Sequence, residues 1–293
     1  MSAKKKATRT RAANAAHDGI GESTPRPAAP DARKPRTTKP RATRTSRPRA
    51  SSALYPDLPV ALPRTTPEQR ARAERLLLAL RAHYPDAHCE LTHSSAHELL
   101  VATILSAQCT DVAVNKATPA LFARFPTPAA YAQATPAEIE PYIRSLGFFR
   151  NKAKSIHGAM TLLVEKFNGE VPRTMDELLT LPGVARKTAG VVLGNIFKIN
   201  DGVVVDTHVE RLSKRLGLAR PSDAPADVEN RLMSLFPRES WCDLSHMLIF
   251  HGRRACKARH VPCGKHPICA EFRVRCNNER WDGEAGAGAS QAT

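Results

Sequence analysis

Residues 181–189 read Leu-Pro-Gly-Val-Ala-Arg-Lys-Thr-Ala and combine a tight turn with a lysine. Pro182-Gly183 opens a helix, where backbone N–H groups and the partial positive charge of the helix N-terminus attract an anion. The same charge disfavours the ammonium form of Lys187 in the first turn, which makes this side chain a candidate amine nucleophile. Asp206 follows nineteen residues later as a candidate base or stabiliser of a cation. A phosphate grip, an amine and a carboxylate together predict chemistry on a nucleic-acid sugar, whereas the turn alone also fits a helix start with a solvated lysine.

Amphipathic helices are predicted on both sides of this turn, and they must position its side chains. Thr66-Pro67 begins a helix with an apolar stripe, and Thr174 with Glu177 has the spacing of a capping box. Only Val203–Val205 resembles a strand, and it is too short to support a sheet, so the fold class is predicted to be all-α. The other predicted helices cover residues 96–107, 112–125, 136–146, 151–167, 207–216, 224–236 and 240–251.

The basic charge is unevenly distributed along the 293 residues, which carry a formal net charge of +16. Residues 1–50 hold fourteen Lys/Arg against three acidic residues, so they contribute +11 of that total. The tail 1–53 is poor in large apolar residues and is predicted to be disordered, as is the C-terminal segment 281–293. We expect the tail to attract phosphate, or to serve only as a solubilising linker. No export signal or membrane span is apparent, which favours a cytoplasmic protein, nucleoid-associated if bacterial.

Seven cysteines are present, and four of them crowd into twenty-one residues near the C-terminus. The odd count and the lack of an export signal argue against a disulfide framework. The clustered four, Cys256, Cys263, Cys269 and Cys276, therefore predict a metal site in a reducing compartment.

Four segments of this chain, in the same order, resemble the endonuclease III family of DNA glycosylases. Residues 181–189 resemble its helix-hairpin-helix, and Val205-Asp206-Thr207-His208 resembles its aspartate segment. The other two are residues 105–117, which begin Leu-Ser-Ala-Gln-Cys-Thr-Asp, and residues 251–253, His-Gly-Arg, with the cysteines beyond. The resemblance covers roughly residues 70–276.

The resemblance implies two α-helical domains with a DNA-binding cleft between them. One would be a six-helix domain of residues 92–200 that carries the hairpin, and the other would join residues 54–91 to residues 201–280 around an iron–sulfur cluster. Such a protein is expected to act as a monomer on double-stranded DNA. It would remove oxidised pyrimidines and then cut the backbone at the abasic site.

The resemblance also implies a role for each matching residue. Lys187 would attack C1′ and form a Schiff base, and Asp206 would assist the amine and stabilise the cationic sugar. The hairpin, with Leu181, Gly183 and Ala185, would hold a backbone phosphate. Ala185 replaces the family's usual second glycine, and we expect it to adopt helical dihedral angles.

Extruding the target base leaves a gap in the duplex that the enzyme must fill. By the resemblance, Gln108 would enter the duplex beside the orphaned base, and Phe148 would insert as an apolar wedge. Packing into the core is the competing interpretation for both side chains. His208 would form a hydrogen bond near the catalytic carboxylate or cap the following helix.

The cysteine spacing departs from the family pattern of Cys-x6-Cys-x2-Cys-x5-Cys. Cys256 and Cys263 keep the first gap, but His266 and Phe272 occupy the third and fourth positions. Because Cys269 and Cys276 follow, four thiolates remain available for a [4Fe–4S] cluster, which is the favoured assignment. His266 as a substitute ligand, a Zn²⁺ site and the absence of any metal are the alternatives.

Two other functions compete with that of a bifunctional glycosylase. A monofunctional relative, such as an adenine glycosylase, would use the carboxylate without the amine, so Lys187 argues against it. A non-catalytic DNA-binding module would keep the hairpin but would not need Lys187 and Asp206.

Overall fold

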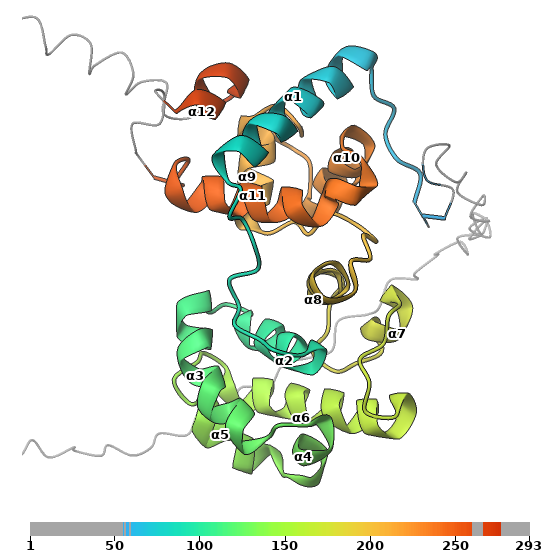
Figure 1. Ribbon diagram of the computed structural model, residues 1–293, viewed down its shortest axis with the longest axis vertical. Coiled ribbons are helices and arrows are strands. Elements are labelled where there is room, and N and C mark those ends of the chain that lie inside the picture. The colour runs from blue at the N-terminus through green and yellow to red at the C-terminus, as the bar shows by residue number, and fades with distance from the viewer. Residues whose placement is uncertain (1–54, 56, 59, 260–265, 277–293) are drawn as a thin grey trace, which may run out of the picture. The chain divides into compact units, whose positions relative to one another are not determined.

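The computed structural model describes residues 55, 57–58, 60–259 and 266–276, and all of its regular elements in these ranges are helices (Figure 1). This confirms the predicted all-α class, and residues 203–205 form no strand. The predicted tails 1–53 and 281–293 lie outside the described residues. No described helix is long and apolar enough to span a bilayer.

The described helices begin close to the positions where capping residues and prolines predict a helix start. Thr66 caps α1 in a capping box with Gln69, and Thr174 caps α7. The short helices α4 and α12 were not predicted, since six residues are too few for a periodic pattern. The bounds are α1 Pro67–His83, α2 Ala96–Ser106, α3 Asp111–Arg124, α4 Pro128–Gln133, α5 Pro136–Ile143, α6 Phe149–Phe167, α7 Met175–Leu179, α8 Arg186–Val192, α9 Thr207–Arg215, α10 Pro225–Leu235, α11 Trp241–Arg254 and α12 Pro267–Phe272.

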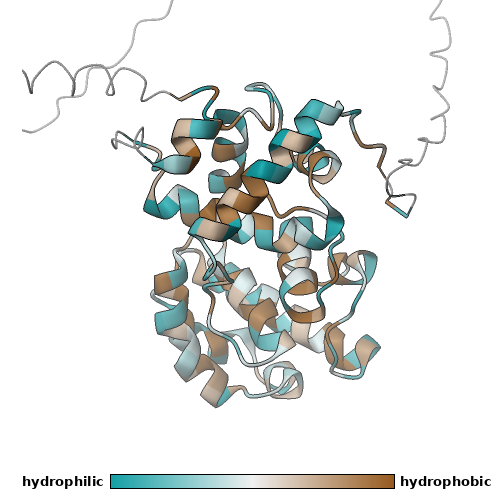
Figure 2. Ribbon diagram, turned by 45° about the horizontal axis from the view of Figure 1, so that its top comes forward, coloured by the Kyte–Doolittle hydropathy of each residue, from teal (hydrophilic) through white to brown (hydrophobic). Residues whose placement is uncertain are grey.

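A first hydrophobic core is formed by a continuous part of the chain, from Leu91 to Leu193. Helix α2 is its centre, because every residue from Leu99 to Leu105 is buried. Helices α3, α6 and α8 pack against α2, and α4 and α5 cover α6. The buried apolar residues of these helices form this core, and Figure 2 shows apolar residues in brown among hydrophilic ones in teal.

A second core combines α1 with α9 to α12, which come from opposite ends of the described chain. Leu76 and Leu80 of α1 and Trp241 of α11 are fully buried in it. The chain therefore passes between the cores twice, once after α1 and once before α9. The domain limits at residues 92 and 201 stay predictions.

Candidate active site

The hairpin before α8 is held in place by one buried side chain and one glycine. Leu181 is buried in the first core, and Gly183 has φ +77°, in the left-handed region that favours glycine. A Cβ on Gly183 would lie 2.6 Å from Cβ of Ser155 in α6. The hairpin therefore approaches α6 closely at position 183, where only glycine fits.

The hairpin presents unused backbone donors ahead of α8. Within the described residues, the N–H groups of Gly183 and Ala185 donate to no acceptor. Ala185 is the N-cap of α8 with φ −98° and ψ 168°, so the expectation of helical angles was wrong. The position is extended because it precedes the first helical residue, and a side chain is therefore tolerated without strain.

Lys187 and Asp206 come from different cores and line the same cleft. Lys187 is the second residue of α8 and is exposed, as predicted for the first turn. Asp206 is the N-cap of α9, and its Oδ1 accepts a hydrogen bond of 2.8 Å from Val209 N–H. Both border a cleft of about 670 Å³, and both also border a smaller cavity of about 110 Å³ beside it.

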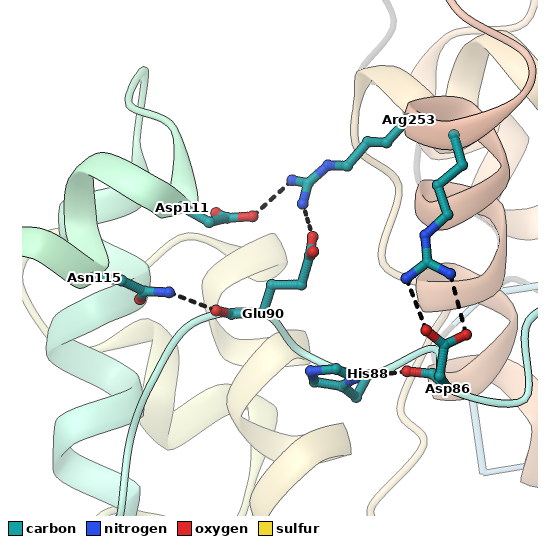
Figure 3. Close-up of polar contacts among 7 residues, drawn as sticks. Asp86, His88, Glu90, Asp111, Asn115 and Arg253 are labelled. Carbon is teal, nitrogen blue, oxygen red and sulfur yellow. Dashed lines mark hydrogen bonds and ion pairs between the residues drawn. The ribbon is translucent and has the colours of Figure 1, made fainter.

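A charged bridge, formed by Arg253, Asp111 and Glu90, closes one side of this cleft (Figure 3). Arg253, near the end of α11, donates to Asp111 Oδ2 over 2.6 Å and pairs with Glu90. Asn115 holds the Glu90 carbonyl oxygen at 2.7 Å. Sequence reasoning gave these residues no individual role, although Asp111 and Arg253 stand inside two of the motifs that carry the family resemblance.

The carboxyl group of Asp111 belongs to the electrostatics of the candidate active site. Burial raises its pKa, and the negative charge of Asp206 raises it further, even with Arg253 against it. Lys187 and His208 act in the opposite direction. Removing one of these charges would therefore change the pKa of Asp111.

Gln108 and Phe148 are both exposed, so packing into the core is wrong for either side chain. Phe148 is 65% exposed. Both backbones are in the left-handed region, with φ 56° and 57°, respectively. Gln108 lies between α2 and α3, and Phe148 is the N-cap of α6. Both side chains therefore protrude from turns whose backbone is unfavourable for residues other than glycine.

His208, in the first turn of α9, faces α11 instead of capping a helix. Its Nδ1 lies 3.3 Å from Arg211 Nη2, and a Cβ on Gly252 would meet the same nitrogen at 2.7 Å. Gly252 therefore lets α9 and α11 approach closely beside the cleft. The cap of α9 is Asp206 itself.

A separate group of soft ligands lies in the second core. His251 Nε2, Cys256 Sγ and Cys269 Sγ are buried and lie within 4.8 Å of one another. The hydrogen bond with Cys269 is the main cause that lowers the pKa of Cys256 to about 6, and Arg215, 3.2 Å from its sulfur, adds to the shift. A buried pair of thiols with guanidinium support suits a soft metal centre.

The structure brings together only part of the predicted ligand set. Cys256 and Cys269 meet, Cys276 packs against the second core outside this group, and Cys263 lies outside the described residues. His251 joins them although sequence reasoning gave it no such role. His266 Nε2 instead contacts the Tyr84 hydroxyl at 3.2 Å, as does His251 Nδ1 at 2.8 Å.

Comparisons with known proteins agree with this arrangement. Residues 101–238 match the HhH-GPD superfamily of base excision DNA repair proteins. The chain is 54% identical to the endonuclease III of Synechocystis over 70% of its length and 93% of that relative. It is 42% identical to the Escherichia coli enzyme over 67% of its length and 92% of the relative. This chain belongs to the endonuclease III family.

Solved endonuclease III structures share the fold as well. A trapped endonuclease III–DNA covalent intermediate is 46% identical, with a TM-score of 0.66 over 70% of this chain and 95% of the other. A non-covalent endonuclease III–DNA complex is 44% identical, with a TM-score of 0.67 over 73% of this chain and 98% of the other. As an endonuclease III, the chain is a bifunctional DNA glycosylase and abasic-site lyase of base excision repair. Membership and the buried His251, Cys256 and Cys269 group together indicate a metal centre.

Proposed function

We propose that Lys187 is the nucleophile that excises oxidised pyrimidines from duplex DNA and then cleaves the abasic site. The observation that carries this proposal is the single cleft bordered by Lys187 and Asp206 from two different cores. Such a cleft can receive an extruded nucleotide with both groups at its sugar. The capture of a covalent intermediate between a 46% identical endonuclease III and DNA supports amine chemistry here.

The reaction proceeds in two steps at the sugar. The Lys187 amine attacks C1′, the bond from C1′ to the base breaks, and the base leaves with the electron pair and takes up a proton. The proton for the base comes from the attacking nitrogen; the C1′–O4′ bond then breaks, O4′ takes up a proton, and a protonated imine joins Lys187 to the opened sugar. This imine acidifies the proton at C2′, whose removal breaks the C3′–O bond and releases the strand on the 3′ side with its phosphate. The Asp206 carboxyl group stabilises the cationic sugar in both steps.

The surrounding residues hold the DNA so that the sugar reaches Lys187. The Gly183 and Ala185 N–H groups bind a backbone phosphate, and the N-terminus of α8 adds its partial charge. Gln108 and Phe148 fill the gap that the extruded base leaves. We infer that the first core corresponds to a domain of residues 92–200, and the second to a domain of residues 54–91 with 201–280.

Borohydride trapping tests this proposal directly. The full chain is incubated with duplex DNA that contains thymine glycol or an abasic site, and borohydride then reduces any imine to a stable covalent adduct. We expect an adduct with the wild type and none with Lys187→Ala. Base release without an adduct would instead indicate a monofunctional glycosylase, and binding without release would indicate a non-catalytic module.

We also propose that the metal centre is a [4Fe–4S] cluster, with Cys256, Cys263, Cys269 and Cys276 as ligands. The burial of Cys256 and Cys269 and the guanidinium of Arg215 beside them support thiolate ligation. When bound, such a cluster would fix the chain beyond α11 and add a redox-active group.

Iron content and visible absorption test the cluster assignment. Cys269→Ser should lower iron content and absorption at the blue end of the spectrum, and Cys276→Ser should do the same if Cys276 is a ligand. If Cys276→Ser keeps a full complement of iron while His251→Gln loses it, the fourth ligand is His251. Zinc in place of iron, or no metal, would refute the assignment.

A further inference from the structure

Lys152 is a buried lysine that the proposed chemistry does not use. It lies in the first turn of α6, four residues after Phe148, and its side chain belongs to a residue only 6% exposed. A buried ammonium group is costly unless it is paired. Its Nζ donates to Cys109 Sγ over 3.0 Å, and the described residues offer it no other hydrogen-bond acceptor.

This hydrogen bond joins the two loops that carry the exposed, left-handed residues. Cys109 directly follows Gln108, and its N–H donates to Ser106 O over 3.0 Å. At the start of α6, Lys152 N–H donates to the carbonyl of the N-cap residue Phe148 over 3.1 Å. Gln108 and Phe148 are therefore connected by the side-chain contact between Cys109 and Lys152, with a short stretch of backbone on each side of it.

Such a contact restrains the backbone near these two left-handed residues. A non-glycine residue persists in the left-handed region only where its surroundings hold it there. Leu146 is buried, but a Cβ added to Gly147 would meet no atom within 4 Å, so no side chain packs over the residue directly before Phe148. The hydrogen bond from Lys152 to Cys109 adds a direct restraint on the separation of the two segments.

We propose that the Lys152–Cys109 bridge is a positioning device that fixes the spacing of Gln108 and Phe148, so that both enter the duplex together when a base is extruded. This inference rests on the proposed function, because it needs Gln108 and Phe148 to enter DNA. Lys152 and Cys109 act through these two residues and do not touch the reacting sugar.

The bridge is tested with a matched pair of substitutions at one position. Cys109→Ala removes the acceptor, whereas Cys109→Ser retains an acceptor for Lys152. Lys152→Met removes the donor at similar volume. The substrate is a duplex with thymine glycol and with 2-aminopurine opposite the lesion, whose fluorescence rises when the pair is opened.

We expect Cys109→Ala and Lys152→Met each to slow the fluorescence rise and base release about tenfold, the scale of one hydrogen bond to a charged group. Cys109→Ser should stay within about twofold of the wild type, and the double variant Cys109→Ala/Lys152→Met should be no slower than either single variant, as expected for one shared contact.

A single-stranded oligonucleotide with an abasic site separates this inference from the proposed function. It contains no duplex to enter, so borohydride trapping on it should proceed at the wild-type rate in all four variants. Equal losses on both substrates, no loss on the duplex, or failure of Cys109→Ser to restore the rate would each overturn the bridge. If the wild type forms no adduct on either substrate, the proposed function fails and the bridge fails with it. Should Lys152→Met not fold, the Cys109 pair still decides the question.

Discussion

Asp206 combines a catalytic charge with a structural hydrogen bond in one carboxyl group. Its Oδ1 caps α9, and the ionised group is proposed to stabilise the sugar cation. An N-cap needs only an acceptor, which an amide supplies as well as a carboxylate. The two tasks can therefore be separated by choosing the substituent.

Asp206→Asn should abolish most base release while leaving stability nearly unchanged. Asp206→Ala should lose activity and also about 1 kcal/mol of unfolding free energy, because the Val209 N–H loses its partner. Single-turnover base release and urea denaturation measure the two effects. Equal stabilities for the two variants would show that the cap contributes nothing.

Within the hairpin, glycine is required at position 183 but not at position 185. Gly183→Ala should cost roughly 1–3 kcal/mol and weaken binding to undamaged duplex DNA, because the left-handed backbone and the contact with Ser155 both oppose a side chain. Ala185→Gly serves as the control. Its extended backbone does not need glycine, so binding should persist and stability should fall by at most about 1 kcal/mol. Denaturation and salt-dependent DNA binding check both expectations.

At the scale of elements, α11 carries two histidines that the fold keeps neutral. Burial lowers the pKa of His246 from 6.5 to about 4 and that of His251 to about 3. His246 Nε2 lies 2.9 Å from Asn195 Oδ1, in the wall of the smaller cavity beside Lys187. The helix therefore joins the two cores through a contact at a site where burial opposes the protonation of His246.

Acid should destabilise the protein partly through His246. Between pH 6.5 and about 4, His246 is protonated in the unfolded chain but stays neutral in the folded one. As the pH is lowered through this range, the unfolding free energy therefore decreases by roughly 1.4 kcal/mol per pH unit from this group. Above pH 6.5 both states are neutral and the contribution is constant. His246→Gln should flatten the stability profile in this window. An unchanged slope in His246→Gln would contradict the assignment.

At the scale of the molecule, Arg253 links the second core to the N-terminus of α3 in the first core (Figure 3). Neighbouring Arg254 instead pairs with Asp86, which follows α1 of the second core. These two arginines form a matched pair, because only one of them spans the two cores.

Arg253→Met should lower the unfolding free energy by about 1–2 kcal/mol at low salt, since Asp111 and Glu90 then lose their shared guanidinium partner. High salt should reduce the difference. Arg254→Met removes a pair whose side chains are 49% and 56% exposed, and should change stability by less than about 1 kcal/mol. Denaturation at two ionic strengths compares them, and equal effects would exclude a special role for the contact between cores.

The sequence predicted those features that depend on short stretches of chain. The Lys187 turn, the caps at Thr66 and Thr174 and the all-α class all follow from residues within about one helical turn of each other. The Arg253–Asp111 pair joins residues 142 positions apart, which no local pattern encodes. Phe148 illustrates another limit of sequence reasoning. Glycine is the residue that favours a left-handed backbone, so the sequence points to Gly147, but the structure has this conformation at the neighbouring Phe148.

The order of the two cores along the chain has a consequence for biosynthesis. The first core, residues 91–193, is continuous and can close as soon as its last helix leaves the ribosome. Helix α1 is translated earlier, yet it must wait for α9 to α12 before its apolar stripe is covered. During synthesis, Lys187 therefore becomes part of a folded core first. Asp206 reaches its folded position only after α9 to α12 have been translated.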